Sequence, residues 1–188
     1  MFIQTEVTPN PATLKFLPGK VVMGQGTAEF RTEEEATGRS PLASSLFKVP
    51  GVSGVFFGYD FITITNEDQD WAHIKPAILG TIMEHFTAGL PVMSAGESAP
   101  VHGEEFFDEG DETIVATVKE LLETRVRPAV AQDGGDITFR GYRDGTVYLN
   151  MRGACAGCPS STATLQYGIQ NLLRHFIPEV KEVEAVAA

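Results

Sequence analysis

The segment that decides the fold of this chain is ITFRGYRDGTVYLNMRGACAGCP, residues 137–159. Apolar and polar residues alternate on both sides of Asp144-Gly145, which is typical of a β-hairpin with one buried face. The hairpin leads into a glycine-rich loop that holds both cysteines of the chain, Cys155 and Cys158, at Cys-x-x-Cys spacing. Pro159 begins an apolar-periodic segment, which predicts a helix to about residue 176. We therefore expect the cysteine pair between the end of a strand and the start of a helix.

A second helix is predicted before the hairpin. The apolar stripe of this helix consists of Ile114, Val118, Leu121 and Leu122. We expect Pro128 to limit the helix, because proline has no N–H to continue the ladder. Asp133-Gly134-Gly135-Asp136 is expected to form the turn into the hairpin, and a short strand is expected within residues 180–186. The order helix, hairpin, helix, strand predicts a small α+β domain over residues 111–188.

Residues 1–88 predict another small α+β domain. Two runs rich in β-branched and aromatic residues, 55–57 and 61–65, flank a short turn and predict a hairpin. Apolar residues then recur every four positions over 74–86, which predicts a long helix. Ser40-Pro41 has the residues of a helix N-cap and first position, so a shorter helix is expected there. Two strands, 2–7 and 13–17, are expected on either side of Pro9-Asn10-Pro11.

Residues 89–110 separate the two predicted domains. This segment contains Pro91, Gly96, Pro100 and Gly103, and it ends in an acidic run without a basic residue. Such a composition favours neither helix nor sheet, so we expect a flexible acidic linker to which Phe106-Phe107 adds one apolar spot that can dock. The predicted fold class is α+β, with two small α+β domains joined by this linker.

Composition narrows the classes of function. The 188 residues are 43% apolar and 21% charged, with a formal net charge of −11. An acidic chain is poorly suited to bind the phosphates of nucleic acid or anionic membrane surfaces. No apolar run is long enough to span a membrane, and the first residues have neither a basic start nor an apolar h-region. We therefore expect a cytoplasmic protein that binds no nucleic acid and no membrane.

The cysteine pair is the candidate site. Two thiolates at this spacing can converge on one metal centre, and a position near a helix N-terminus lowers the pKa of a thiol. Three functions are compatible with the motif: a thiol–disulfide oxidoreductase, a zinc site and an iron–sulfur site. The first requires a thioredoxin-like βαβ crossover, whereas a tight hairpin precedes the motif and 30 residues follow Cys158. We expect exposed sulfurs, because glycine-rich loops usually lie at the surface.

Zinc and iron–sulfur sites normally use four protein ligands, and the chain has two cysteines. His175 lies 17 positions after Cys158, on the order of 25 Å along a continuous helix. The other histidines, His73, His85 and His102, are expected to be ordinary surface or helix residues. A second copy of the chain, related by two-fold symmetry, is the simplest source of two more thiolates.

Several motifs match a known family. The C-terminal half resembles the cysteine-containing domain of NifU-like (Nfu) proteins, and the N-terminal half resembles the Nfu N-terminal domain. In the C-terminal half the matching residues are Arg127-Pro128, Asp133-Gly134-Gly135-Asp136 and Gly153-Ala154-Cys155-Ala156-Gly157-Cys158-Pro159-Ser160-Ser161. In the N-terminal half they include Phe2-Ile3-Gln4-Thr5-Glu6, Pro9-Asn10-Pro11, Ser40-Pro41-Leu42-Ala43, Val55-Phe56-Phe57-Gly58, Trp71 and Ile82-Met83-Glu84-His85-Phe86. The match to the family's start also suggests a bacterial form without a targeting peptide.

The resemblance implies an iron–sulfur cluster scaffold or carrier and not an enzyme. Cys155 and Cys158 would be the ligands, two from each of two subunits, of a labile cluster that is typically [4Fe–4S]. Its implied partners are a second copy of the chain, an upstream cluster assembly scaffold and apo-proteins that receive the cluster. The N-terminal domain would dock a target or partner. No residue is expected to be catalytic, because dinucleotide-binding, Walker, HExxH and GxSxG motifs are all absent from the sequence.

Overall fold

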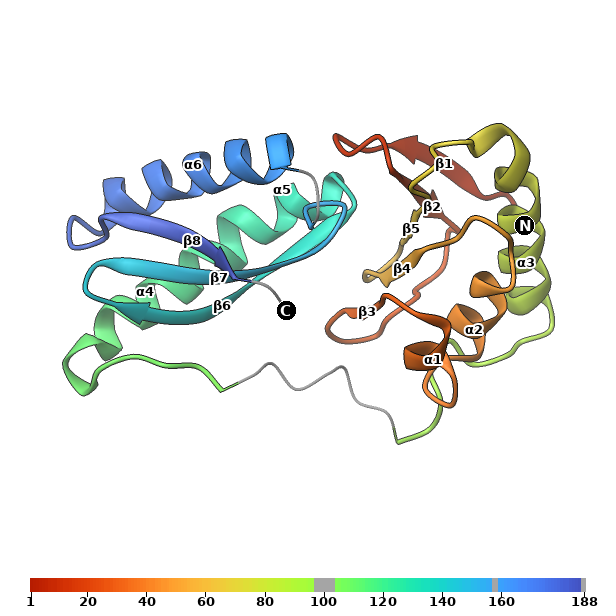
Figure 1. Ribbon diagram of the computed structural model, residues 1–188. Helices are drawn as coiled ribbons and strands as arrows, with labels where there is room; N and C mark the ends of the chain where they lie inside the picture. The colour runs from red at the N-terminus through yellow and green to blue at the C-terminus, as the bar shows by residue number, and fades with distance from the viewer. Residues whose placement is uncertain (97–103, 157–158, 187–188) are drawn as a thin grey trace. The chain divides into compact units, whose positions relative to one another are not determined.

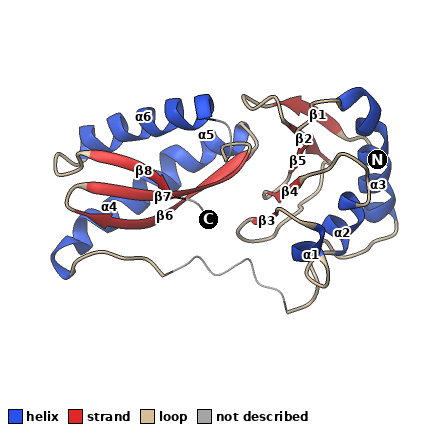
Figure 2. Ribbon diagram, in the orientation of Figure 1, coloured by secondary structure: helices blue, strands red, loops and turns tan. Residues whose placement is uncertain are grey.

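The computed structural model describes residues 1–96, 104–156 and 159–186, except for the side chains of residues 159–161. The chain divides into two compact units, residues 1–100 and 101–188 (Figure 1). Both units combine helices with a sheet (Figure 2), which confirms the α+β fold class expected from the sequence.

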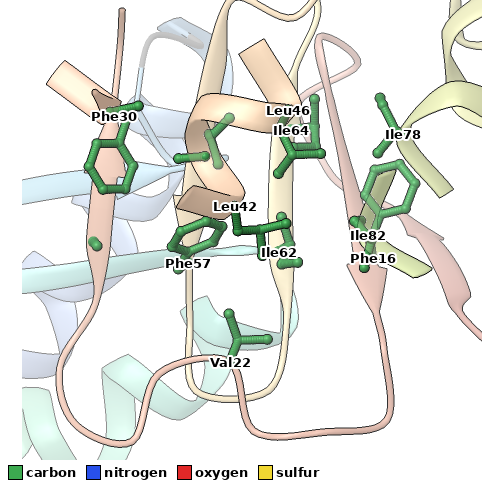
Figure 3. Packing of buried hydrophobic residues seen from close by; sticks show 14 of the residues in the cluster. Phe16, Val22, Phe30, Leu42, Leu46, Phe57, Ile62, Ile64, Ile78 and Ile82 are labelled. Carbon is green, nitrogen blue, oxygen red and sulfur yellow. The ribbon is translucent and has the colours of Figure 1, made fainter. Parts of the chain in front are cut away.

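The first unit is built on an antiparallel sheet of five strands in the order β1-β2-β5-β4-β3. The strands are β1 (Gln4–Val7), β2 (Thr13–Leu17), β3 (Ala28–Phe30), β4 (Gly54–Phe57) and β5 (Ile62–Thr65). The helices are α1 (Glu33–Ala36), α2 (Pro41–Phe47) and α3 (Trp71–Thr87). Leu42 and Leu46 from α2, and Ile78 and Ile82 from α3, meet the apolar side chains of the sheet in one buried core (Figure 3).

Local sequence signals account for most of this unit. The hydroxyl of Ser40 accepts a hydrogen bond from the N–H of Ala43 at 3.0 Å, so Ser40 is the expected N-cap of α2. The β4–β5 hairpin and the long helix lie where periodicity placed them. Sequence patterns missed β3 and α1, because elements of three and four residues are too short to show a period. The acidic residues Glu33, Glu34 and Glu35 stand at the start of α1, where the helix dipole favours negative charge.

The second unit packs its helices against a three-stranded sheet in the order β6-β7-β8. The strands are β6 (Gly135–Arg143), β7 (Thr146–Gly153) and β8 (Glu182–Val186), and the helices include α4 (Glu112–Leu121), α5 (Arg127–Gln132) and α6 (Pro159–Phe176). A 3₁₀ turn, η1 (Glu109–Asp111), precedes α4. The β6–β7 hairpin is antiparallel and β8 joins β7 in parallel, which confirms the hairpin and the short final strand.

Helical structure continues past Pro128, contrary to expectation. A π-helical turn, η2 (Leu122–Val126), joins α4 to α5. The N–H of Arg127 donates to the carbonyl of Leu122, five residues earlier, so the turn is one residue wider than an α-helical turn. Pro128 follows as the second residue of α5. The wider turn accommodates a proline that would break a regular helix, because it changes which carbonyls need a donor.

The segment predicted as a flexible linker, residues 89–110, includes residues 97–103, which lie outside the described residues. Its described ends are attached to their own units. Val92 and Met93 pack against the core of the first unit, and the carbonyl of Val92 accepts a hydrogen bond from the hydroxyl of Ser40 at 2.6 Å. At the other end Phe106 docks on β6, as its apolar character suggested.

Candidate metal centre

Cys155 lies in the turn between the end of β7 and the start of α6. The turn begins at Gly153, whose φ of +65° favours glycine. The N–H of Ala154 donates to the carbonyl of Gly134 at 3.2 Å, which ties the turn to the segment before β6. The carbonyl of Cys155 accepts a hydrogen bond from the hydroxyl of Thr162 at 2.8 Å, which ties it to α6. The cysteine backbone is thus held from two directions.

The side chain of Cys155 is buried, whereas the sequence suggested an exposed sulfur. The residue is 7% exposed and belongs to the hydrophobic core of the second unit. Gly135 explains how it fits, because a Cβ on Gly135 would lie 2.6 Å from the Cys155 Sγ and 2.8 Å from the carbonyl oxygen of Arg152. Glycine at this position therefore opens the space that the sulfur fills, across the first pair of the β6–β7 ladder.

Burial raises the pKa of the Cys155 thiol to about 12, and the negative charges of Asp133 and Asp136 contribute in the same direction. The expected lowering of a thiol pKa was assigned to Cys158, at the start of α6. Cys158 lies outside the described residues, so its position and its pKa stay predictions.

Alkylation measures the burial of Cys155 directly. In a Cys158→Ala variant free of metal, we expect Cys155 to react with iodoacetamide at pH 8 at least about 100-fold more slowly than free cysteine, because a raised pKa leaves little thiolate. The rate should rise about tenfold per pH unit up to pH 10. In guanidinium chloride the difference should vanish. Fast alkylation of the folded variant would contradict the buried position.

An ion pair between a half-buried arginine and a buried aspartate supports the same corner of the fold. The guanidinium of Arg127 binds the carboxylate of Asp136 through two hydrogen bonds, Nε to Oδ1 at 2.9 Å and Nη2 to Oδ2 at 3.0 Å. Arg127 also donates from Nη1 to the carboxylate of Glu123 at 2.6 Å. The bonds to Asp136 raise the pKa of the guanidinium, so the pair stays charged. It joins the start of α5 to the start of β6, next to Gly135.

Arg127 was singled out only as part of the family match, and Gly135 and Asp136 were expected to be turn residues. The structure places Gly135 against the Cys155 Sγ and Asp136 in the ion pair. The paired glycines were the available signal, since a strand glycine often marks a close approach.

The described histidines make contacts of their own within their units. His73 pairs with Asp70 at 2.7 Å, and His85 is buried with its Nε2 3.1 Å from the carbonyl oxygen of Pro91, both in the first unit. His175 is an exposed residue at the end of α6 and packs on Phe176, and His102 lies outside the described residues. Within the described ranges, no three His, Cys, Asp or Glu side chains form a group that could hold a metal ion.

Comparison with known proteins places the chain in a family. The family model "Scaffold protein Nfu/NifU N terminal" matches residues 3–89, and the model "NifU-like domain" matches residues 118–184. A human protein named "NFU1 iron-sulfur cluster scaffold homolog, mitochondrial" is 53% identical over 188 residues, which cover 99% of this chain and 72% of the human protein. This chain belongs to the Nfu/NifU family. The resemblance inferred from the motifs is confirmed.

Two further comparisons differ in how much of this chain they cover. The protein of the same name from Drosophila ananassae is 52% identical over 188 residues, and the match covers 99% of this chain but 64% of the fly protein. The chain therefore spans less than two thirds of that relative. A solution NMR structure of a NifU-like protein from Saccharomyces cerevisiae is 30% identical, covers 50% of this chain and 86% of the yeast chain, and has a TM-score of 0.46.

The family comparison corrects the expected location. A bacterial, cytoplasmic protein was predicted from the first residues of the sequence, whereas the curated human and fly relatives are named mitochondrial. The prediction was wrong because it inferred a cellular compartment from the lack of a leader-like pattern in the first residues. Among the described residues, no helix is long and apolar enough to cross a membrane.

Proposed function

We propose that this chain is an iron–sulfur cluster scaffold and carrier, which binds a labile cluster through Cys155 and Cys158 and passes it to apo-proteins. The proposal rests on where the cysteines fall in the sequence. This chain belongs to the Nfu/NifU family, and its only two cysteines, Cys155 and Cys158, fall in the sequence between the end of β7 and the start of α6. The chain acts as a carrier and not as an enzyme, with the cluster as its cargo.

Ligand number implies a second copy. An iron–sulfur cluster is usually held by four protein ligands, and one chain has two cysteines. Two chains related by a two-fold axis would complete the set, with Cys155 and Cys158 of each copy around one cluster. A [4Fe–4S] cluster fits this arrangement and is the type we propose.

The burial of Cys155 suggests why such a cluster would be labile. To bind iron, the Cys155 sulfur must lose its proton and leave the core, so binding sacrifices core packing of about 1 kcal/mol per chain. On release the sulfur returns to the space beside Gly135. The empty chain is thereby stabilised relative to the loaded one, and transfer to a target with exposed, preformed ligands becomes favourable.

The raised pKa of Cys155 also bears on the alternative function. A thiol–disulfide oxidoreductase needs one thiolate at neutral pH, and burial raises the pKa of the Cys155 thiol, so in this alternative Cys158 would have to supply the thiolate. A structural zinc dimer would use the same cysteine ligands as a cluster, so the iron, sulfide and zinc content of the protein must distinguish the two.

Anaerobic reconstitution with iron and sulfide tests the proposed function. We expect a brown product with about four iron and four sulfide per two chains, and a dimer by light scattering, because each chain supplies half of the ligands. The product should also activate an apo [4Fe–4S] ferredoxin. A colourless monomer with free thiols would contradict the proposal, as would protein purified without oxygen that holds stoichiometric zinc and no iron.

Partners follow from the same chemistry. The upstream donor would be another cluster assembly scaffold, and the acceptors would be apo-proteins with vacant cysteine ligands. The first unit contains no cysteine, so we propose that it docks a target or partner.

A further inference from the structure

The outer edge of β6 carries a short segment of the chain itself. β6 is an edge strand of the second unit, since the strand order is β6-β7-β8. Phe106 forms a parallel bridge with Gly141: its N–H donates to the carbonyl of Arg140 at 3.3 Å, and its carbonyl accepts from the N–H of Tyr142 at 2.9 Å. Residues 104–107 are called here the edge segment. Phe106 of this segment pairs with β6 as a single residue of an added strand.

Two features of β6 create this docking position. The ladder with β7 is irregular between Phe139 and Gly141, so Arg140 is an extra residue in the edge strand. Gly141 then leaves a hollow, because a Cβ there would lie 2.4 Å from the ring of Phe106. The ring fills this hollow and packs on Tyr148 with their centroids 5.2 Å apart. In strand addition, backbone hydrogen bonds hold the added segment and a pocket beside them selects a side chain. Here the hollow at a strand glycine is such a pocket, and it selects an aromatic ring.

Basic side chains surround the ring. The guanidinium of Arg143 lies 5.3 Å from the centre of the Phe106 ring. Arg140 donates to the carbonyl of Glu104, and Lys119 pairs with the carboxylate of Glu105. Three of the 14 basic residues of a strongly acidic chain thus surround one acidic-aromatic segment.

Few contacts hold the edge segment in place. The described residues show one bridge, one half-buried ring that packs on Tyr148 and Arg143, a hydrogen bond from Arg140 to the carbonyl of Glu104, and an ion pair whose side chains are 45% and 34% exposed. Exposed ion pairs contribute at most about 1 kcal/mol, and segments with few buried contacts open locally at low cost. Another segment of the same chemistry can therefore replace this one.

We propose that the outer edge of β6 is a recognition site for an extended segment of a partner protein in which an acidic residue precedes a phenylalanine. The edge segment of the chain fills the site until the partner displaces it. The partner adds a strand to β6, places its phenylalanine over Gly141 and its acidic residue beside Lys119. This function is separate from the cysteine pair and does not depend on the cargo.

Peptide binding to the full chain tests the site. The probe is a fluorescein-labelled peptide, EEFFDEG, which has the sequence of residues 104–110. The tethered segment competes at an effective concentration of about 1 mM, so the peptide should bind the unchanged chain weakly. Phe106→Ala removes the competing ring and should lower the peptide Kd at least about tenfold. Reconstitution of the cluster should be the same in both proteins, which separates a failure here from a failure of the proposed carrier function.

Two controls test whether the phenylalanine and the acidic residue of the peptide determine its binding. The peptide EEAFDEG should not bind the Phe106→Ala chain, because it lacks the ring that fills the hollow. Adding Lys119→Glu to that chain should weaken binding of EEFFDEG and strengthen binding of EKFFDEG, since the charges are exchanged. Circular dichroism confirms that each variant is folded. Equal affinity of the unchanged and Phe106→Ala chains for EEFFDEG, or no response to the charge exchange, would overturn the proposal.

Discussion

Replacing Cys155 or Cys158 with alanine should abolish cluster binding, with iron falling from about two per chain to a background level after anaerobic reconstitution. Either substitution leaves two protein ligands for a dimer instead of four. The loss should be complete in both variants, because two thiolates per dimer cannot retain the cluster when solvent and free thiols compete as ligands for its iron. Iron and sulfide analysis after gel filtration, with the visible absorbance, measures the effect.

Stability separates loss of a ligand from loss of the fold. Cys155→Ala removes a buried sulfur and should cost about 1 kcal/mol, a decrease in Tm of about 4–8 °C for a unit of this size. Ala163→Ser, on the exposed face of α6, is the matched control and should retain full cluster binding. Unchanged iron content in either cysteine variant would contradict the assigned ligands.

Arg127→Met should destabilise the second unit by about 2–4 kcal/mol, because it removes two hydrogen bonds and the facing positive charge from the buried carboxylate of Asp136. The side chain of Asp136 is 6% exposed, so water cannot replace the two hydrogen bonds from the guanidinium. Because Asp136 follows Gly135, which contacts Cys155, the lifetime of a bound cluster should also shorten. Arg125→Met removes an exposed charge two residues earlier, whose guanidinium lies 5.6 Å from the centre of the Phe176 ring, and is the matched control, with an expected change of at most about 1 kcal/mol.

Urea unfolding can assign the effect of Arg127→Met to one unit. Trp71, the only tryptophan, lies in the first unit with Tyr59, whereas the other three of the four tyrosines, Tyr142, Tyr148 and Tyr167, lie in the second and dominate the tyrosine signal. The tyrosine-detected transition should move to lower urea while the tryptophan-detected transition stays in place. Equal stability of the Arg127→Met and Arg125→Met proteins would show that the ion pair contributes little.

Local patterns predicted the elements well where they were long enough to repeat. The alternation around Asp144-Gly145 predicted the hairpin, and the four-residue period over 74–86 predicted α3. Pro128 was misjudged because a π-helical turn depends on which carbonyls find donors, and residue order does not show this. The short elements β3 and α1 were missed because they contain less than one period of any pattern.

The sequence by itself determined the order of the longer elements, the α+β class and the place of Cys155 between β7 and α6, because turn residues and periodicity act over a few neighbouring positions. Only the tertiary structure decided that Cys155 is buried, that Arg127 binds Asp136 and that Phe106 fills the hollow over Gly141. These contacts join segments that are separate in the chain. The contacts of Cys155 and Phe106 exist because glycines at positions 135 and 141 let another part of the chain approach where any side chain would collide.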